Sequence, residues 1–157
     1  MNGGAWKTYA APIVLDRQGV YLVRFRSVDA AGNVESAQTT QVRIDKTDPV
    51  FIGVAIPTVL PANNKMVDVT VLTISLDLLS GSNGITLVSV TSDDPGVTPD
   101  DIVGWTIGAY DTRGQLRAEW TADGRTRTYT LRYRSVDKAG NESLAAATVV
   151  VPGGRAR

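Results

Sequence analysis

The sequence predicts an all-β protein made of antiparallel β-sandwich domains, and three observations lead to this prediction. Segments rich in β-branched and aromatic residues are short, they are separated by Gly, Pro, Asn and Asp, and helical periodicity is scarce. Bulky apolar residues alternate with polar ones in the clearest of these segments. Finally, YLVRFRSVDAAGN at residues 21–33 returns as YTLRYRSVDKAGN at residues 129–141, with nine of the thirteen positions identical. The repeat indicates two related units in tandem.

Each copy of the repeat predicts a half-buried strand followed by a tight turn. In both copies every second residue is apolar, and the alternate positions include arginines (Arg24, Arg26, Arg132 and Arg134) that would face solvent. Glycine provides the positive φ of a tight reversal, while Asp and Asn side chains can accept bonds from nearby backbone N–H groups. We therefore expect structural turns at Asp29, Gly32 and Asn33 and at Asp137, Gly140 and Asn141.

The remaining strands are predicted from the same alternation and from the spacing of turn residues. They are expected at residues 11–15, 39–44, 51–56, 67–78, 85–90, 105–109, 115–120 and 146–151. Within 67–78, the apolar phase changes from the series that ends at Val71 to the series that begins at Leu72. Such a phase change predicts a bulge or bend near Val71–Leu72.

A short polar junction, IDKTDP at residues 44–49, separates the two units. Proline cannot donate to a strand ladder and restricts the residue before it, so the junction is expected to be stiff. We expect a partial domain at 1–48, a complete sandwich at 49–153 and a tail at 154–157. The first unit has about half the strands that a sandwich needs, so its inner face would be uncovered. It is expected to be truncated, or to be completed by another chain.

Composition excludes several classes of function. Sixteen basic and sixteen acidic residues cancel, so the chain has no net field that would attract nucleic acid. Cysteine and histidine are both absent, which removes thiol nucleophiles, disulfides and His-based proton transfer. No apolar run is long enough to insert into a membrane. The first residues lack the features of a signal peptide, so we expect any export signal to lie upstream of Met1.

Several motifs resemble bacterial Ig-like repeats. The first unit, with NGGAW at residues 2–6 and the IDKTDP junction, resembles the second half of chitobiase-C-terminal-like repeats. The second unit, with PANNKMV at 61–67 and QLRAE at 115–119, resembles a hyalin-repeat-like module. The resemblance implies one complete Ig-like sandwich preceded by the C-terminal half of a similar domain. It also implies that Trp6 is buried, and that Tyr21 and Tyr129 form tyrosine corners, in which the hydroxyl bonds to backbone a few residues upstream.

The sequence contains candidates for three kinds of site. The acidic residues Asp93, Asp94, Asp100 and Asp101 share a loop, but sequence neighbours in a loop are not a carboxylate pair across a cleft, so we expect no catalysis. Calcium could be held by oxygen ligands at Asp45, Asp48, Asp137 and Asn141; alternatively, these residues serve only the turn and the junction. Carbohydrate could stack on Trp120 or Trp105, unless these rings pack in the core.

The predicted function is that of a non-catalytic spacer or presentation module in a larger secreted or cell-surface bacterial protein. The expected partners are neighbouring domains of that protein, with neither nucleic acid nor an inserted membrane segment. Two alternatives remain open. The chain could be an accessory module that binds polysaccharide or another partner beside a secreted hydrolase, or a subunit that self-associates by completing its half domain in trans.

Overall fold

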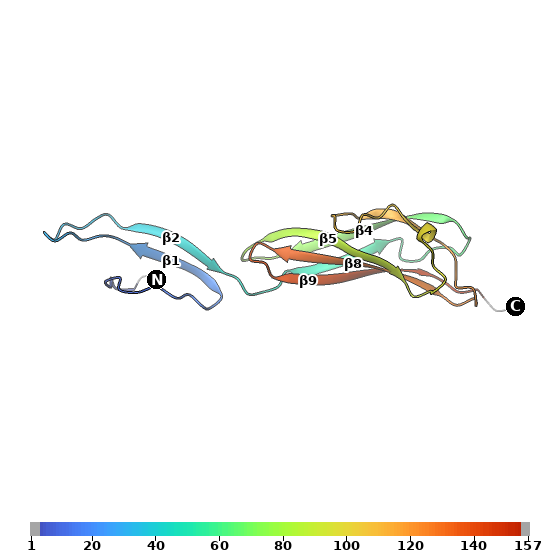
Figure 1. Ribbon diagram of the computed structural model, residues 1–157, viewed down its shortest axis with the longest axis horizontal. Coiled ribbons are helices and arrows are strands. Elements are labelled where there is room, and N and C mark those ends of the chain that lie inside the picture. The colour runs from blue at the N-terminus through green and yellow to red at the C-terminus, as the bar shows by residue number, and fades with distance from the viewer. Residues whose placement is uncertain (1–3, 155–157) are drawn as a thin grey trace. The chain divides into compact units, whose positions relative to one another are not determined.

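A computed structural model describes residues 4–154, which are almost entirely strands and loops (Figure 1). Among these residues, only the short 3₁₀ turn η1 (Pro99–Asp101) is helical, and none forms a helix long and apolar enough to span a membrane. The chain divides between Thr47 and Asp48 into two compact units. This division lies one residue before the expected boundary, and the all-β prediction is confirmed.

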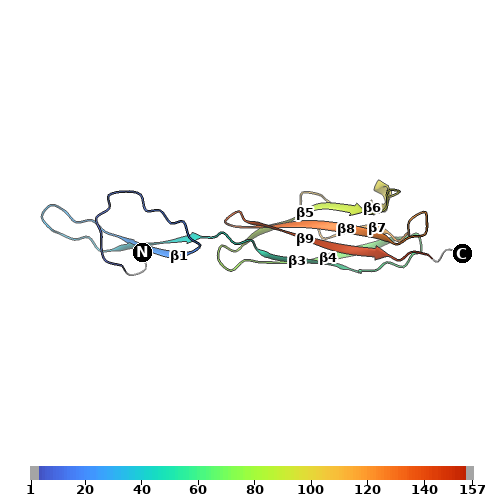
Figure 2. The same ribbon diagram turned by 90° about the horizontal axis from the view of Figure 1, so that it is seen from below.

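The second unit is an antiparallel sandwich of two sheets (Figure 2). The first sheet contains, in spatial order, β3 (Val50–Ile56), β4 (Met66–Leu76), β7 (Arg113–Arg117) and β6 (Ile102–Val103). The second contains β5 (Ser82–Ser92), β8 (Arg127–Asp137) and β9 (Glu142–Val151) in that order. Lettered in chain order, the strands give ABED and CFG, which is the arrangement of the Ig constant-type sandwich. The predicted Ig-like sandwich is therefore confirmed.

The chain enters and leaves this sandwich at opposite ends. At the entering end, the Ser143 hydroxyl at the start of β9 donates to the carbonyl of Pro49, just before β3. After β3 the chain crosses to the second sheet, where Val59 forms a parallel bridge with Val150. It leaves after Val151, which pairs with Arg127 at the far end of β9.

The core lies between the two sheets and uses the apolar face that the repeat predicted for β8. Tyr129, Leu131 and Tyr133 have no exposed surface, whereas Arg132 and Arg134, at alternate positions of the same strand, face solvent. The other fully buried large side chains come from both sheets and from the crossing segment: Leu60, Val69, Val71, Leu87, Leu116, Val149 and Val151. The alternation in the sequence thus identified the inner face of β8 correctly.

The predicted bulge near Val71–Leu72 is wrong. The register of β4 with β3 is continuous there, with Val71 opposite Ala55 and Leu72 opposite Val54. The alternation simply continues, so Val71 faces the core while Leu72 faces solvent. The apolar phase change arises because the inner face of β4 is apolar only as far as Val71 and continues with Thr73 and Ser75, while its outer face becomes apolar at Leu72. The irregularities of pairing lie in β5 instead, between Ser82 and Gly84 and between Leu87 and Ser89.

Two predicted strands are loops. Residues 105–109 form a turn beside β5, where the N–H of Gly108 donates to the carbonyl of Leu87 and the N–H of Leu87 donates to that of Ala109. The turn has local backbone bonds to β5, but it is too short and too bent to extend the ladder. Residues 11–15, in the first unit, also form no strand. In that unit β1 (Gly19–Phe25) and β2 (Gln38–Ile44) pair only with each other among the described residues.

The first unit is a single β-hairpin with no core of its own. None of residues 4–47 is buried. The expected burial of Trp6 is wrong: this side chain is 42% exposed, and the guanidinium groups of Arg24 and Arg26 lie 5.1 and 4.2 Å from its ring centre. An isolated two-stranded hairpin has no second layer to bury an aromatic ring, so Trp6 packs against arginines instead.

Candidate functional site

The turn of the first repeat copy is held by the carboxylate of Asp29. Its Oδ1 accepts the N–H groups of Ala31 and Asn33 at 3.0 and 2.8 Å, and its Oδ2 accepts the Asn33 side-chain amide at 2.7 Å. Gly32 has a φ of +87°, a conformation that glycine adopts at little cost. The side-chain bond from Asn33, together with the backbone bonds, lowers the pKa of Asp29.

The turn of the second copy repeats this geometry in a buried setting. Asp137 is 1% exposed, and its carboxylate accepts the N–H groups of Ala139 and Asn141 at 2.8 and 2.9 Å and the Asn141 amide at 2.7 Å. Burial works to raise the pKa of Asp137, but the bonds from Asn141 and Ala139 lower it overall. Gly140 has a φ of +94°. The six turn residues therefore act as the sequence predicted.

The predicted calcium ligands have other contacts in the structure. Asp137 and Asn141 are bonded to each other in the turn. Asp45 belongs to the first unit, and its Oδ1 accepts the N–H of Thr47 at 3.1 Å. Asp48 is exposed at the start of the second unit. Calcium binding by these residues stays a prediction.

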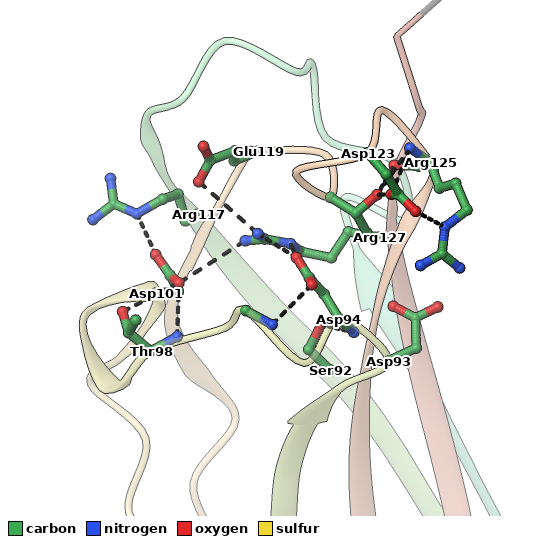
Figure 3. Close-up of polar contacts among 12 residues, drawn as sticks. Ser92, Asp93, Asp94, Thr98, Asp101, Arg117, Glu119, Asp123, Arg125 and Arg127 are labelled. Atoms are coloured by element: carbon green, nitrogen blue, oxygen red, sulfur yellow. Dashed lines mark hydrogen bonds and ion pairs between the residues drawn. The ribbon is translucent and has the colours of Figure 1, made fainter.

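A cluster of charged residues that the sequence analysis did not identify lies where β5 ends and β8 begins (Figure 3). At its centre is Arg127, which is only 3% exposed. Its Nε and Nη2 donate to Asp94 Oδ2 at 3.0 and 2.6 Å, and its Nη1 donates to the Tyr129 hydroxyl at 3.1 Å. Asp94 is itself 6% exposed. A buried charge pair with this geometry joins the loop after β5 to the first residues of β8.

The same cluster extends to β7 through Asp101. The Nε of Arg117 donates to Asp101 Oδ1, and Asp101 Oδ2 accepts the N–H of Thr98 at 2.9 Å. Arg127 Nη1 lies 4.0 Å from Asp101 Oδ2, and its Nη2 lies 3.9 Å from the partly exposed Glu119 Oε2. We call Asp94, Asp101, Arg117, Glu119 and Arg127 the end cluster.

The protonation of the end cluster is unsuited to general acid catalysis. The N–H of Gly96 contributes most to lowering the pKa of Asp94, and Arg127 also lowers it, against the opposing effect of burial. Burial works to raise the pKa of Asp101, but bonds from Thr98 and Arg117 lower it overall. A catalytic acid near neutral pH needs a raised pKa instead. The end cluster therefore serves to hold the loop after β5 in place.

Acid should therefore destabilise the second unit. Because the folded pKa values of Asp94 and Asp101 lie below the unfolded value, their stabilisation is complete above about pH 4 and is lost as the pH falls through the folded values. We expect a nearly constant melting temperature between about pH 7 and pH 5 and a decline below about pH 4, measured by circular dichroism. A melting temperature that rises on acidification would contradict this assignment.

The two tryptophans predicted to bind carbohydrate differ in their surroundings. Trp105 is half-buried against the core, its indole N–H donates to the Gln115 carbonyl at 3.4 Å, and a Cβ on Gly114 would lie 2.3 Å from its ring. Trp120 is 41% exposed. One edge of its ring packs against Gly154, where an added Cβ would lie 3.0 Å from the ring. Only Trp120 offers an accessible aromatic surface of the kind that the prediction requires.

The tyrosine corners differ between the two repeat copies. The Tyr21 hydroxyl donates to the Arg17 carbonyl, four residues upstream, at 2.7 Å, as expected. The Tyr129 hydroxyl donates instead to the Arg117 carbonyl on β7, twelve residues upstream, at 2.9 Å. The expected local corner at Tyr129 is therefore wrong, because Arg127 occupies the place that Gly19 holds in the first copy and directs the hydroxyl into the end cluster. An Arg two residues before the first Tyr of the second repeat copy, where the first copy has Gly19, was the available signal for this cluster.

The fold defines the second unit as an Ig-like β-sandwich. Comparison with known protein families and with characterised proteins gave no match to this chain.

Proposed function

We propose that this chain is a non-catalytic Ig-like spacer or presentation module of a larger secreted or cell-surface bacterial protein. The observation that carries the proposal is the opposite placement of the two connections of the sandwich: Pro49 lies at the start of β9, and the chain leaves after Val151 at its end. The ten residues of β9 span roughly 33 Å. A domain with this connectivity holds whatever precedes and follows it a fixed length apart.

The internal chemistry of the sandwich supports the same proposal. Among the described residues, no buried side-chain nitrogen or oxygen lacks a hydrogen-bond partner. The buried carboxylates Asp94, Asp101 and Asp137 are all held by arginines or by backbone N–H groups. Polar groups that are fully used in holding loops and turns stiffen a domain, and none of these three is free to react with a substrate.

Carbohydrate binding is the second candidate, and the exposure of Trp120 is the observation that favours it. A flat, accessible indole can stack on a sugar ring. The neighbouring Glu119, 43% exposed in its side chain, could accept bonds from sugar hydroxyls. The two candidates differ in one measurable property, which is whether the fluorescence of Trp120 changes when polysaccharide is added.

The spacer function predicts that tryptophan fluorescence stays unchanged across a panel of soluble polysaccharides. Neither exposed indole, Trp6 nor Trp120, would contact a ligand. A saturable quench that disappears in Trp120→Phe would contradict the proposal and establish the carbohydrate candidate. Trp6→Phe is the matched control, because the two rings are almost equally exposed, at 42% and 41%.

Completion in trans is a third candidate, favoured by the absence of any buried residue among residues 4–47. The hairpin leaves both of its outer edges without a partner strand in the described part of the chain. Another chain could add strands at these edges. Self-association of this kind would depend on β1 and β2, and it would tolerate charged substitutions on the surface of the second unit.

A further inference from the structure

The outer face of β3 and β4 carries a continuous row of large aliphatic side chains. Three rungs of the ladder pair apolar residues with each other: Val50 with Leu76, Ile52 with Ile74, and Val54 with Leu72. Ile56 extends the row on β3, opposite Thr70. These seven aliphatic residues are Val50, Ile52, Val54, Ile56, Leu72, Ile74 and Leu76, and each is 50 to 70% exposed. We call them the apolar stripe.

The apolar stripe is bounded by polar residues on the same sheet face. Where β4 pairs with β7, Arg113 lies opposite Thr70 and Gln115 lies opposite Asp68. The Gln115 side chain donates to Asp68 at 2.9 Å. The face therefore has one apolar half, formed by the β3–β4 ladder, and one polar half, formed where β7 joins it. An apolar centre with a polar rim is the usual anatomy of a protein interface.

The size of the apolar stripe fits an interface between two proteins. Its exposed apolar surface is about 500 Å², on the basis of about 120 Å² for each fully exposed side chain. Each partner in a standard interface buries about 800 Å², of which roughly 56–65% is apolar. The apolar stripe thus supplies the apolar share of one side of a standard interface. It lies in the upper half of the roughly 300–600 Å² that the largest exposed apolar patch of a monomer covers, and such patches are often functional.

We propose that the apolar stripe is the contact of a two-fold symmetric dimer of this chain. Its three fully aliphatic rungs read Val–Leu, Ile–Ile, Val–Leu, so the order of residue types in these three rungs is the same from either end. A two-fold axis along the central rung sets each Val–Leu rung against the other Val–Leu rung of the second copy, and Ile52 against its own equivalent. Such self-complementarity is what an isologous interface requires.

The charges of the chain are compatible with this contact. The apolar stripe contains no ionisable group, so burying its seven side chains removes none of their own charges from water. The rim carries both signs, at Asp68 and Arg113. The whole chain has no net charge, which removes the repulsion that keeps many proteins monomeric. The two outer faces would pack about 10 Å apart, as sheets do within a sandwich.

The dimer is tested on the full chain by multi-angle light scattering and sedimentation equilibrium, from micromolar to millimolar concentration. The wild type is expected to change from monomer to dimer over this range. Ile74→Lys places a charge on the central rung. It is expected to raise the dissociation constant of the dimer by at least about ten-fold. Leu144→Lys is the matched control, because Leu144 is a 71% exposed strand residue outside the apolar stripe, and it is expected to dimerise like the wild type.

A second variant tests the dimer without placing a lysine in β4, where the charge could disturb the fold itself. The chain has no cysteine, so Ile52→Cys introduces one thiol that would face its own equivalent across the axis. A short bis-maleimide is expected to give a covalent dimer of Ile52→Cys but not of Leu144→Cys. A wild type that stays monomeric at millimolar concentration would overturn the proposal and assign the apolar stripe to a different partner. A dimer that survives Ile74→Lys and leaves Ile52→Cys uncrosslinked would overturn it in favour of contact through β1 and β2.

Discussion

Replacing Arg127 by methionine is expected to reduce the free energy of unfolding of the second unit by about 3–5 kcal/mol, as is typical when one partner of a buried ion pair is removed. Arg127 and Asp94 are 3% and 6% exposed. Methionine fills much of the space but leaves the Asp94 carboxylate without the two bonds that it now accepts at 3.0 and 2.6 Å. The measurement is urea unfolding followed by far-UV circular dichroism.

Two further variants separate the buried pair from a general effect of losing an arginine. Arg125 pairs with Asp123 at 2.5 Å, but both side chains are more than half exposed, so Arg125→Met should change the unfolding midpoint little. In the double variant Arg127→Met and Asp94→Asn, the side chain at position 94 is uncharged, and part of the lost stability should return. Equal losses in Arg127→Met and Arg125→Met would show that the end cluster does not anchor the loop.

Much of the fold could be predicted because the inner faces of the strands obey simple alternation. Tyr129, Leu131 and Tyr133 occupy every second position and are all fully buried. The same rule failed in β4, where the apolar residues lie on the inner face as far as Val71 and on the outer face from Leu72 onward, because alternation cannot tell a core-facing aliphatic residue from an exposed one. Leu72 and Ile74 therefore belong to the apolar stripe and not to a bulge.

The end cluster could not be predicted because its members are far apart in the sequence. Asp94 and Arg127 are separated by 33 positions, and only the pairing of β5 with β8 brings them together. Composition likewise cannot distinguish solvated carboxylates from those held by arginines, so the acidic loop appeared as four equivalent aspartates. Asp93 differs from Asp94 in the structure, since its carboxylate caps the N–H of Thr128 at 2.7 Å and is not bonded to Arg127.

The repeated turn allows one motif to be tested in two environments. Asp137→Ala removes an acceptor of three hydrogen bonds at a site with 1% exposure, and the N–H groups of Ala139 and Asn141 then lose their partner. We expect the melting temperature of the second unit to fall by several degrees, because unpaired donors next to a core are costly. Thermal unfolding and amide hydrogen exchange at Ala139 and Asn141 measure the effect.

Asp29→Ala is the matched variant, because Asp29 makes the same three bonds in an exposed turn. Water can replace the lost acceptor there, so the amides of Ala31 and Asn33 should exchange faster while the melting temperature of the second unit stays the same. Equal losses of stability in the two variants would mean that the motif itself, and not its burial, determines the stability of the turn. A loss confined to Asp137→Ala would mean that the same set of turn hydrogen bonds stabilises a domain only where a second sheet excludes water from it.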